Sequence, residues 1–96
     1  MTKEEIKTTV VQVIRGYCDA GKRPAISAHS RPVVDLGLES RDGVDFACDI
    51  SARLGVLVPY EVNPFVSDDG KRARTVGEIV NLLCGYAQQR GELVHA

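Results

Sequence analysis

The sequence contains no tryptophan, only one methionine, and no excess of charge of either sign, since its formal net charge is −1. The near-neutral balance gives no support for nucleic acid or an anionic membrane surface as the partner. No apolar run approaches the roughly 20 residues that a membrane-spanning helix needs. The first few residues also lack the basic and apolar regions of a signal peptide. We therefore expect a cytoplasmic protein with no membrane insertion.

The composition that remains is that of a small folded domain. Hydrophobic residues make up 44% of the 96 residues and charged residues 26%, which is typical of a globular chain rather than a disordered one. A chain of this length forms one domain, here 1–96, and has too little interior for both a core and a deep catalytic cleft. No additional apolar face is evident in the sequence, so a monomer is expected.

The cysteines are few and widely spaced: Cys18, Cys48 and Cys84. None forms a Cys-x-x-Cys pair, and the two histidines, His29 and His95, lie far from all three in the sequence. This spacing does not favour zinc, and no metal site is predicted. We expect the cysteines to be buried small hydrophobic residues in a reducing compartment.

Two helices are predicted from their start signals and apolar periodicity. Each begins at a Thr-x-x-Glu capping box, in which side chains satisfy free amides of the first turn; the boxes are Thr2 with Glu5 and Thr75 with Glu78. The first helix is expected over residues 3–20 and a stop at Gly21; the last is expected to end at Gly91. Apolar residues recur at helical spacing in both segments.

A further helix is predicted over residues 40–54, with Ser40 as its N-cap and Gly55 as its end. We expect its inner face to hold Val44, Ala47, Cys48, Ser51 and Leu54, widened by Ile50, and its outer face to hold Asp42, Asp45, Asp49 and Arg53. Residues 60–66 are expected to hold one short helix, limited by Pro64. The fold class is therefore all-α: a small four-helix bundle of three longer helices and one short helix, with a long loop over 22–39.

One segment carries most of the functional information, because a loop delivers a serine to the start of an acidic helix. It reads Asp35-Leu36-Gly37-Leu38-Glu39-Ser40-Arg41 and continues through Asp42, Val44, Asp45, Phe46 and Ile50 to Leu54-Gly55-Val56-Leu57-Val58-Pro59. The segment resembles the acyl carrier protein family, in which an Asp-Ser-Leu motif follows a loop ending in Leu-Gly and opens the second helix. The first helix and the Thr75-Val76 start of the last helix fit the same layout, so the resemblance covers nearly the whole chain.

The resemblance implies that Ser40 is the attachment point of 4'-phosphopantetheine, donated from coenzyme A by a separate phosphopantetheinyl transferase. The arm ends in a thiol that carries acyl groups as thioesters. The protein itself would catalyse nothing, and would deliver these groups to acyl-transferring or acyl-activating enzymes of fatty-acid, lipid or related secondary biosynthesis. A helix start suits the added negative charge, because free amides and the helix dipole both favour an anion there.

Each of these residues also has a plainer interpretation. Ser40 can be a helix N-cap without any chemistry, and the two roles do not exclude each other. A serine hydrolase is poorly supported, because the sequence has no Gly-x-Ser-x-Gly elbow and no preceding strand. Asp42, Asp45 and Asp49, together with Glu39, form either a solvated face or a docking surface for basic patches on partner enzymes, and the resemblance favours docking.

The sequence departs from the family pattern at several places. Arg41 stands where the motif has leucine, and an arginine cannot enter a partner's apolar pocket without desolvating its charge. Glu39 replaces aspartate, and the chain is less acidic than many family members. The segment 63–74 looks longer than its family counterpart and carries a basic cluster, defined as Lys71, Arg72 and Arg74. These departures indicate a specialised carrier in a dedicated pathway, and the basic cluster is either a partner contact or a solvated turn.

Two other classes of function stay open at this point. The first is a carrier-like helical interaction module that is never modified, in which Arg41 blocks the transferase and Ser40 only caps a helix. The second is a small helical nucleic-acid-binding domain, which is disfavoured because the helix after Ser40 is acidic where phosphate contacts would require basic residues.

Overall fold

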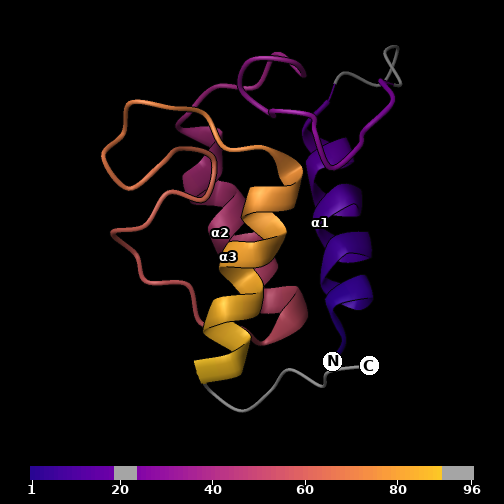
Figure 1. Ribbon diagram of the computed structural model, residues 1–96, viewed down its shortest axis with the longest axis vertical. Coiled ribbons are helices and arrows are strands. Elements are labelled where there is room, and N and C mark those ends of the chain that lie inside the picture. Colours follow the sequence, from indigo (N-terminus) through magenta and orange to yellow (C-terminus); the bar gives the residue numbers. More distant parts are fainter. Residues whose placement is uncertain (19–23, 90–96) are drawn as a thin grey trace.

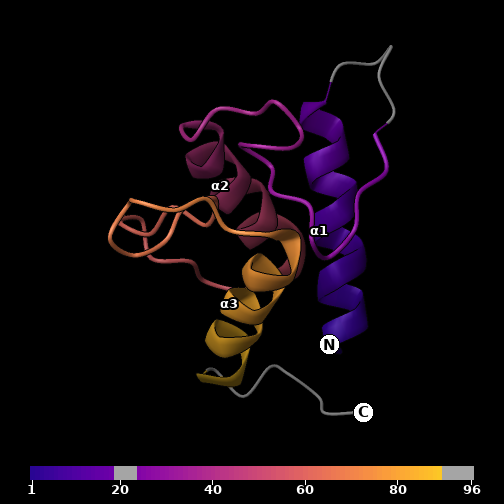
Figure 2. The same cartoon turned by 45° about the horizontal axis from the view of Figure 1, so that its top comes forward.

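The computed structural model describes residues 1–18 and 24–89. This part of the chain folds into three helices, α1 (Lys3–Tyr17), α2 (Asp42–Leu54) and α3 (Val76–Gln89). Helix α1 packs against both α2 and α3 (Figure 1). The long loop between α2 and α3, residues 55–75, lies on the side of these helices that faces away from α1, in the view of Figure 1 and in that of Figure 2. The all-α class is therefore confirmed.

The short helix expected over residues 60–66 does not form. Two separate turns take its place, closed by hydrogen bonds from the Val62 amide to the Pro59 carbonyl (3.0 Å) and from the Val66 amide to the Asn63 carbonyl (3.2 Å). Pro64 lacks the amide that a continuous helix would need at this point. An isolated antiparallel bridge joins Val66 to Ala73 later in the loop. Between residues 55 and 75 the chain therefore contains turns and no helix.

The helix starts follow their local signals closely. Thr2 Oγ1 accepts a hydrogen bond from the Glu5 amide at 3.2 Å. At α3 the capping box is reciprocal: Thr75 Oγ1 accepts from the Glu78 amide, and Glu78 Oε1 accepts from the Thr75 amide. The capping box at Thr75 is thus confirmed in full, and the one at Thr2 is confirmed for the bond that its threonine side chain accepts. Both signals depend only on residues three positions apart.

The ends of the helices agree less completely with expectation. Helix α2 ends at Gly55, whose φ of 68° is left-handed and whose amide donates to the Ser51 carbonyl at 2.9 Å. Helix α1 ends at Tyr17 rather than at residue 20. The expected stop signals Gly21 and Gly91 lie outside the described residues.

The core is built from one face of each helix together with anchors from the loops. Its buried members are Ile6, Val10, Val13 and Ile14 of α1, Phe46 and Ile50 of α2, Val76, Ile79, Val80, Leu83, Cys84 and Ala87 of α3, and Leu38, Val56 and Phe65 of the loops. The apolar stripes predicted for the first and last helices are therefore confirmed.

The inner face predicted for α2 is right for Ile50, which is buried, and for Leu54, which packs against the core, but wrong for Val44 and Cys48. Val44 is 52% exposed and Cys48 is exposed, whereas Gly43, Phe46 and Ile50 are buried. The Phe46 ring packs against the ring of Phe65 from the following loop, with centroids 5.1 Å apart. A phenylalanine buries more apolar area than a valine, so packing favours the rotation of α2 that places Phe46 inside.

The cysteines are correspondingly divided among environments. Cys84 is buried in α3, Cys18 is half-buried at the end of α1, and Cys48 is exposed on α2. All three are free thiols. The expectation that every cysteine would be buried is therefore right for Cys84 and wrong for Cys48. Burial raises the pKa of the Cys84 thiol, which makes it a poor nucleophile.

Candidate functional site

Ser40 lies on the surface, in the turn that leads into α2. It is not the N-cap that the sequence predicted: Arg41 occupies that position, with helical dihedral angles and no capping hydrogen bond from its side chain. The Ser40 hydroxyl forms no hydrogen bond with any residue that the structure describes. The hydroxyl is thus presented to solvent rather than used to start the helix.

The Asp42 side chain reaches back from the start of α2 to the residue before Ser40. Its Oδ2 accepts a hydrogen bond from the Glu39 amide at 2.8 Å. The Asp42 and Gly43 amides donate back to the carbonyls of Glu39 and Ser40, both at 3.0 Å. These three bonds close a tight turn around Ser40, and they place the start of helical geometry before the first residue of α2. Asp42 is therefore a structural residue of the turn, whatever else it contacts.

A second anchor reaches the serine from the loop after α2. Asn63 Nδ2 donates to the Ser40 carbonyl at 2.7 Å, and Asn63 Oδ1 accepts from the Phe65 amide at 3.0 Å. This approach requires glycine at position 43, because a Cβ there would lie only 1.9 Å from Asn63 Oδ1. The side chain of Asn63 thus bridges the Ser40 turn and the loop that covers α2.

The sequence alone does not predict this bridge. Asn63-Pro64 is a turn-forming pair, and Gly43 is a helical glycine that no local feature requires. Those two signals indicate a turn and a close backbone approach separately. Neither says that the turn and the glycine meet, since they are twenty residues apart in the chain.

The basic cluster (Lys71, Arg72 and Arg74) is largely committed to internal contacts. Arg74 is buried, and its guanidinium donates to the Val66 carbonyl at 2.6 Å and to Asp68 Oδ1 at 2.9 Å. Arg72 makes two parallel hydrogen bonds to Glu78, at 2.9 and 2.7 Å. Lys71 remains exposed at the turn. A solvated or partner-binding role for the whole cluster therefore does not fit the geometry.

The Glu78 carboxylate, in the first turn of α3, is stabilised in its charged form. The hydrogen bonds from the Arg72 guanidinium, followed by the one from the Thr75 amide, lower the pKa of Glu78 to about 2. The hydrogen bond to Glu78 and the charge of that carboxylate raise the pKa of the Arg72 guanidinium, because both favour its charged form. The loop 55–75 is thus tied to the start of α3 by an ion pair that stays charged at neutral pH.

The acidic residues predicted as a docking face are not equally free. Asp45 is exposed and makes no hydrogen bond or ion pair with the described part of the chain. Asp49 accepts a hydrogen bond from the Tyr17 hydroxyl at 2.5 Å. Burial, then this bond and the charge of Asp49, raise the pKa of Tyr17 far above its usual value. The acidic face of α2 therefore lies beside the last turn of α1.

Arg41 stands next to the serine as an exposed cation. Its side chain is 82% exposed and pairs with that of Glu39, which is 62% exposed. An ion pair so open to water contributes little to folding stability. Val44 and Cys48 follow Arg41 at helical spacing and are exposed on the same outward face of α2. A partner that approaches Ser40 along this face therefore meets a cation and an apolar side chain first, with Asp45 alongside.

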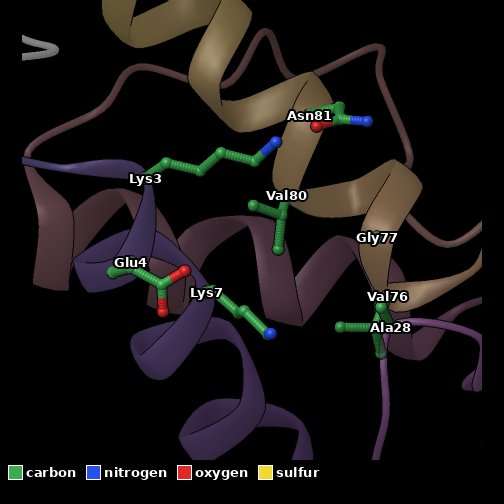
Figure 3. Close-up of a pocket in the computed structure, with 8 residues that line it drawn as sticks. All are labelled: Lys3, Glu4, Lys7, Ala28, Val76, Gly77, Val80 and Asn81. Atoms are coloured by element: carbon green, nitrogen blue, oxygen red, sulfur yellow. The ribbon is translucent and has the colours of Figure 1, made fainter. Parts of the chain in front are cut away.

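The structure also has a groove elsewhere, between the first turns of α1 and α3. It has a volume of about 320 Å³ and is lined by Lys3, Glu4, Lys7, Ala28, Val76, Gly77, Val80 and Asn81. Figure 3 shows the Lys3 and Lys7 side chains extending from α1 on either side of Val80. Loop carbonyls of Ala28 and Ser30 accept the Gly77 and Val76 amides, so the start of α3 is already satisfied internally. Ser40 is not among the lining residues.

No family model, no curated protein and no solved structure matches this chain. Within residues 1–18 and 24–89, no group of three or more histidine, cysteine, aspartate or glutamate side chains is placed to hold a metal ion. The helices in these ranges are also too short or too polar to cross a membrane. Inference about function therefore rests on the residues and geometry around Ser40.

Proposed function

We propose that this protein is an acyl carrier, in which Ser40 holds a covalent 4'-phosphopantetheine arm and the arm carries acyl groups as thioesters. The observation that carries the proposal is an exposed serine hydroxyl, free of hydrogen bonds to the described residues, on a turn that is fixed at the start of α2. A modification site needs a hydroxyl that an enzyme can reach and a backbone that holds it in one place. Ser40 meets both requirements.

The attachment reaction uses the hydroxyl as a nucleophile. Its oxygen forms a new bond to the phosphorus that bears pantetheine in coenzyme A, while the pyrophosphate bond breaks and adenosine 3',5'-bisphosphate leaves. The hydroxyl proton passes to a base of the transferase. The resulting phosphodiester carries one negative charge near the start of α2, where the helix dipole favours an anion. The carrier supplies only the serine and its placement, and it performs no catalysis itself.

Partner enzymes would bind the outward face of α2. Asp45 offers a free carboxylate, and Asp49 and Glu39 add negative charge that is partly engaged by Tyr17 and Arg41. Exposed charges of this kind speed encounter and set orientation more than they add affinity. Asp42 belongs to the predicted docking set, but its contact with the Glu39 amide assigns it mainly to the turn.

Arg41 favours a specialised carrier in a dedicated pathway. Its guanidinium is exposed beside Ser40, where a general partner would offer an apolar pocket to a leucine. A partner with a carboxylate facing this position would pair with Arg41, whereas a partner with a dry pocket would exclude it. The acyl group itself would be supplied by an acyl-activating or acyl-transferring enzyme adapted to this surface.

The intact mass of the protein tests the proposal directly. The protein is incubated with coenzyme A, magnesium and a broad-specificity phosphopantetheinyl transferase, beside Ser40→Ala and Arg41→Leu. We expect the mass of one phosphopantetheine to be added to the wild type and none to Ser40→Ala. If only Arg41→Leu gains the mass, the carrier requires a dedicated transferase that accepts the arginine.

A second candidate function is an interaction module that is never modified. The exposed Arg41–Glu39 pair beside Ser40 favours it, because a cation at this position can keep a transferase away. This candidate predicts that the wild type gains no mass with any transferase, although Arg41→Leu, which lacks the blocking cation, does. That result would contradict the carrier proposal.

A further inference from the structure

Resting on the carrier function proposed above, we infer that Asn63 is a positioning residue for the modification of Ser40. It comes from the loop between α2 and α3 and contacts the serine through the backbone, not through the hydroxyl. Its role would be to hold the turn so that the hydroxyl points to solvent in one orientation. The loop 55–75 would thereby form part of the modification site.

The hydrogen bonds around Ser40 support this role. The Ser40 carbonyl accepts from Asn63 Nδ2 at 2.7 Å and from the Gly43 amide at 3.0 Å, so its orientation is fixed by two donors. On the amino-terminal side, the turn is fixed by the bond from the Glu39 amide to Asp42. The Ser40 hydroxyl has no such restraint from the described residues. Its position is therefore set by the backbone bonds, and Asn63 supplies the one that comes from outside the turn.

Asn63 is itself held in place by hydrogen bonds to other residues of the loop 55–75. Its Oδ1 accepts from the amide of Phe65, whose ring is fully buried against Phe46 of α2. Its carbonyl accepts from the Val66 amide at 3.2 Å and from the buried Arg74 guanidinium at 3.3 Å. An amide group with both ends bonded and a packed neighbour has little freedom to move. The anchor is thus preorganised, as a positioning residue must be.

The substitution Asn63→Asp separates the contact with Ser40 from the rest of the loop. An aspartate keeps an oxygen that can accept from the Phe65 amide. It loses the donor to Ser40 and places a carboxylate oxygen against the serine carbonyl, which repels it. Asp68→Asn is the matched control, because it removes a charge from the same loop, at the ion pair with Arg74, without touching Ser40.

The two variants and the wild type are compared in the transferase assay with coenzyme A as the pantetheine donor. We expect Asn63→Asp to lower kcat for modification by roughly three- to tenfold, the effect of one hydrogen bond. The KM for coenzyme A should stay unchanged, because coenzyme A binds to the transferase. The KM for the carrier should change less than about twofold, since the outward face of α2 is intact. Asp68→Asn should resemble the wild type in all three constants.

A second readout does not depend on modification. The ¹³C chemical shift of the Ser40 carbonyl and the hydrogen-exchange rate of the Gly43 amide are measured in the unmodified proteins. In Asn63→Asp the carbonyl shift should move and exchange should quicken, whereas in Asp68→Asn both should match the wild type.

The outcomes separate this inference from the carrier function. If Asn63→Asp is modified at the wild-type kcat although the carbonyl shift has moved, Asn63 does not position the serine. An equal loss of kcat in Asp68→Asn would mean that general loosening of the loop is responsible, which also overturns the inference. If the wild type takes up no phosphopantetheine from any transferase, the carrier function fails first. The contact between Asn63 and Ser40 is then structural only.

Discussion

Replacing Gly43 by alanine tests how tightly the loop 55–75 is docked on α2. A Cβ at this position would lie 1.9 Å from Asn63 Oδ1, 2.8 Å from Asn63 Cγ and 3.1 Å from Phe65 Cβ. The first two distances cannot be tolerated, so the Asn63 side chain must leave its place. It then loses its hydrogen bonds to the Ser40 carbonyl and the Phe65 amide.

The expected cost follows from these contacts. Displacing two hydrogen bonds and crowding Phe65 should cost about 2–4 kcal/mol. Alanine regains less than about 1 kcal/mol over glycine here, because Gly43 lies in the first turn of α2 and not in its interior. We therefore expect Gly43→Ala to lower the free energy of unfolding by about 1–3 kcal/mol. Without the contact with Asn63 the same substitution would be stabilising, so the sign of the effect is informative.

The measurement is urea denaturation followed by circular dichroism, with the m-value checked for constancy. Gly85→Ala is the matched control, because Gly85 lies inside α3 and no described residue beyond its own helical turns comes within 4 Å of a Cβ added there. It should raise stability by about 0.5–1 kcal/mol. A Gly43→Ala protein as stable as the wild type would refute the docking described above. In an Asn63→Ala background the penalty at position 43 should shrink, since the clashing atoms are gone.

Two further predictions concern the contacts between the loop and the start of α3. The pKa of Glu78 is held at about 2, below its ordinary 4.5, so its contribution to stability is fully present above about pH 4.5 and is lost as the pH falls towards 2. The free energy of unfolding should therefore fall more steeply over this range in the wild type than in Glu78→Gln, and parallel curves would contradict the assignment. Arg74→Met should destabilise the protein by about 1–3 kcal/mol, because it removes the guanidinium donor of the Val66 carbonyl and one of the two donors of the Asn63 carbonyl. Asp68→Asn should cost less than about 1 kcal/mol, since Asp68 is largely exposed. Equal thermal midpoints for the two variants would show that the buried arginine is not the anchor.

The features of the fold that were predicted correctly are local ones. The capping signals at Thr2 and Thr75 need only a glutamate three residues later, and in both the threonine oxygen accepts the amide of that glutamate. Gly55 ends α2 because glycine alone adopts a φ of 68° without cost. The apolar stripes of the first and last helices were correct because each has one dominant face.

The predictions for α2 were less successful, because two of its faces are apolar. Val44 and Cys48 make one stripe, Phe46 begins another at the same helical period, and Ile50, which the prediction placed inside, lies between the two. Periodicity alone does not choose between them. The ring of Phe65, from a loop nineteen residues beyond Phe46, decides the choice by packing against Phe46.

The residues of the candidate site also fall into two groups, those next to Ser40 in the chain and those that folding brings to it. Ser40 can be placed before an acidic helix, with Arg41, Asp42 and Asp45 after it, from the sequence alone, because these residues are neighbours in the chain. The contact of Asn63 with the serine carbonyl and the burial of Arg74 depend instead on how the distant loop packs against α2. Such contacts join residues that are far apart in sequence, and whether they form depends on how the whole chain packs. A charge or an amide has the same appearance in the sequence whether it faces water or a buried carbonyl.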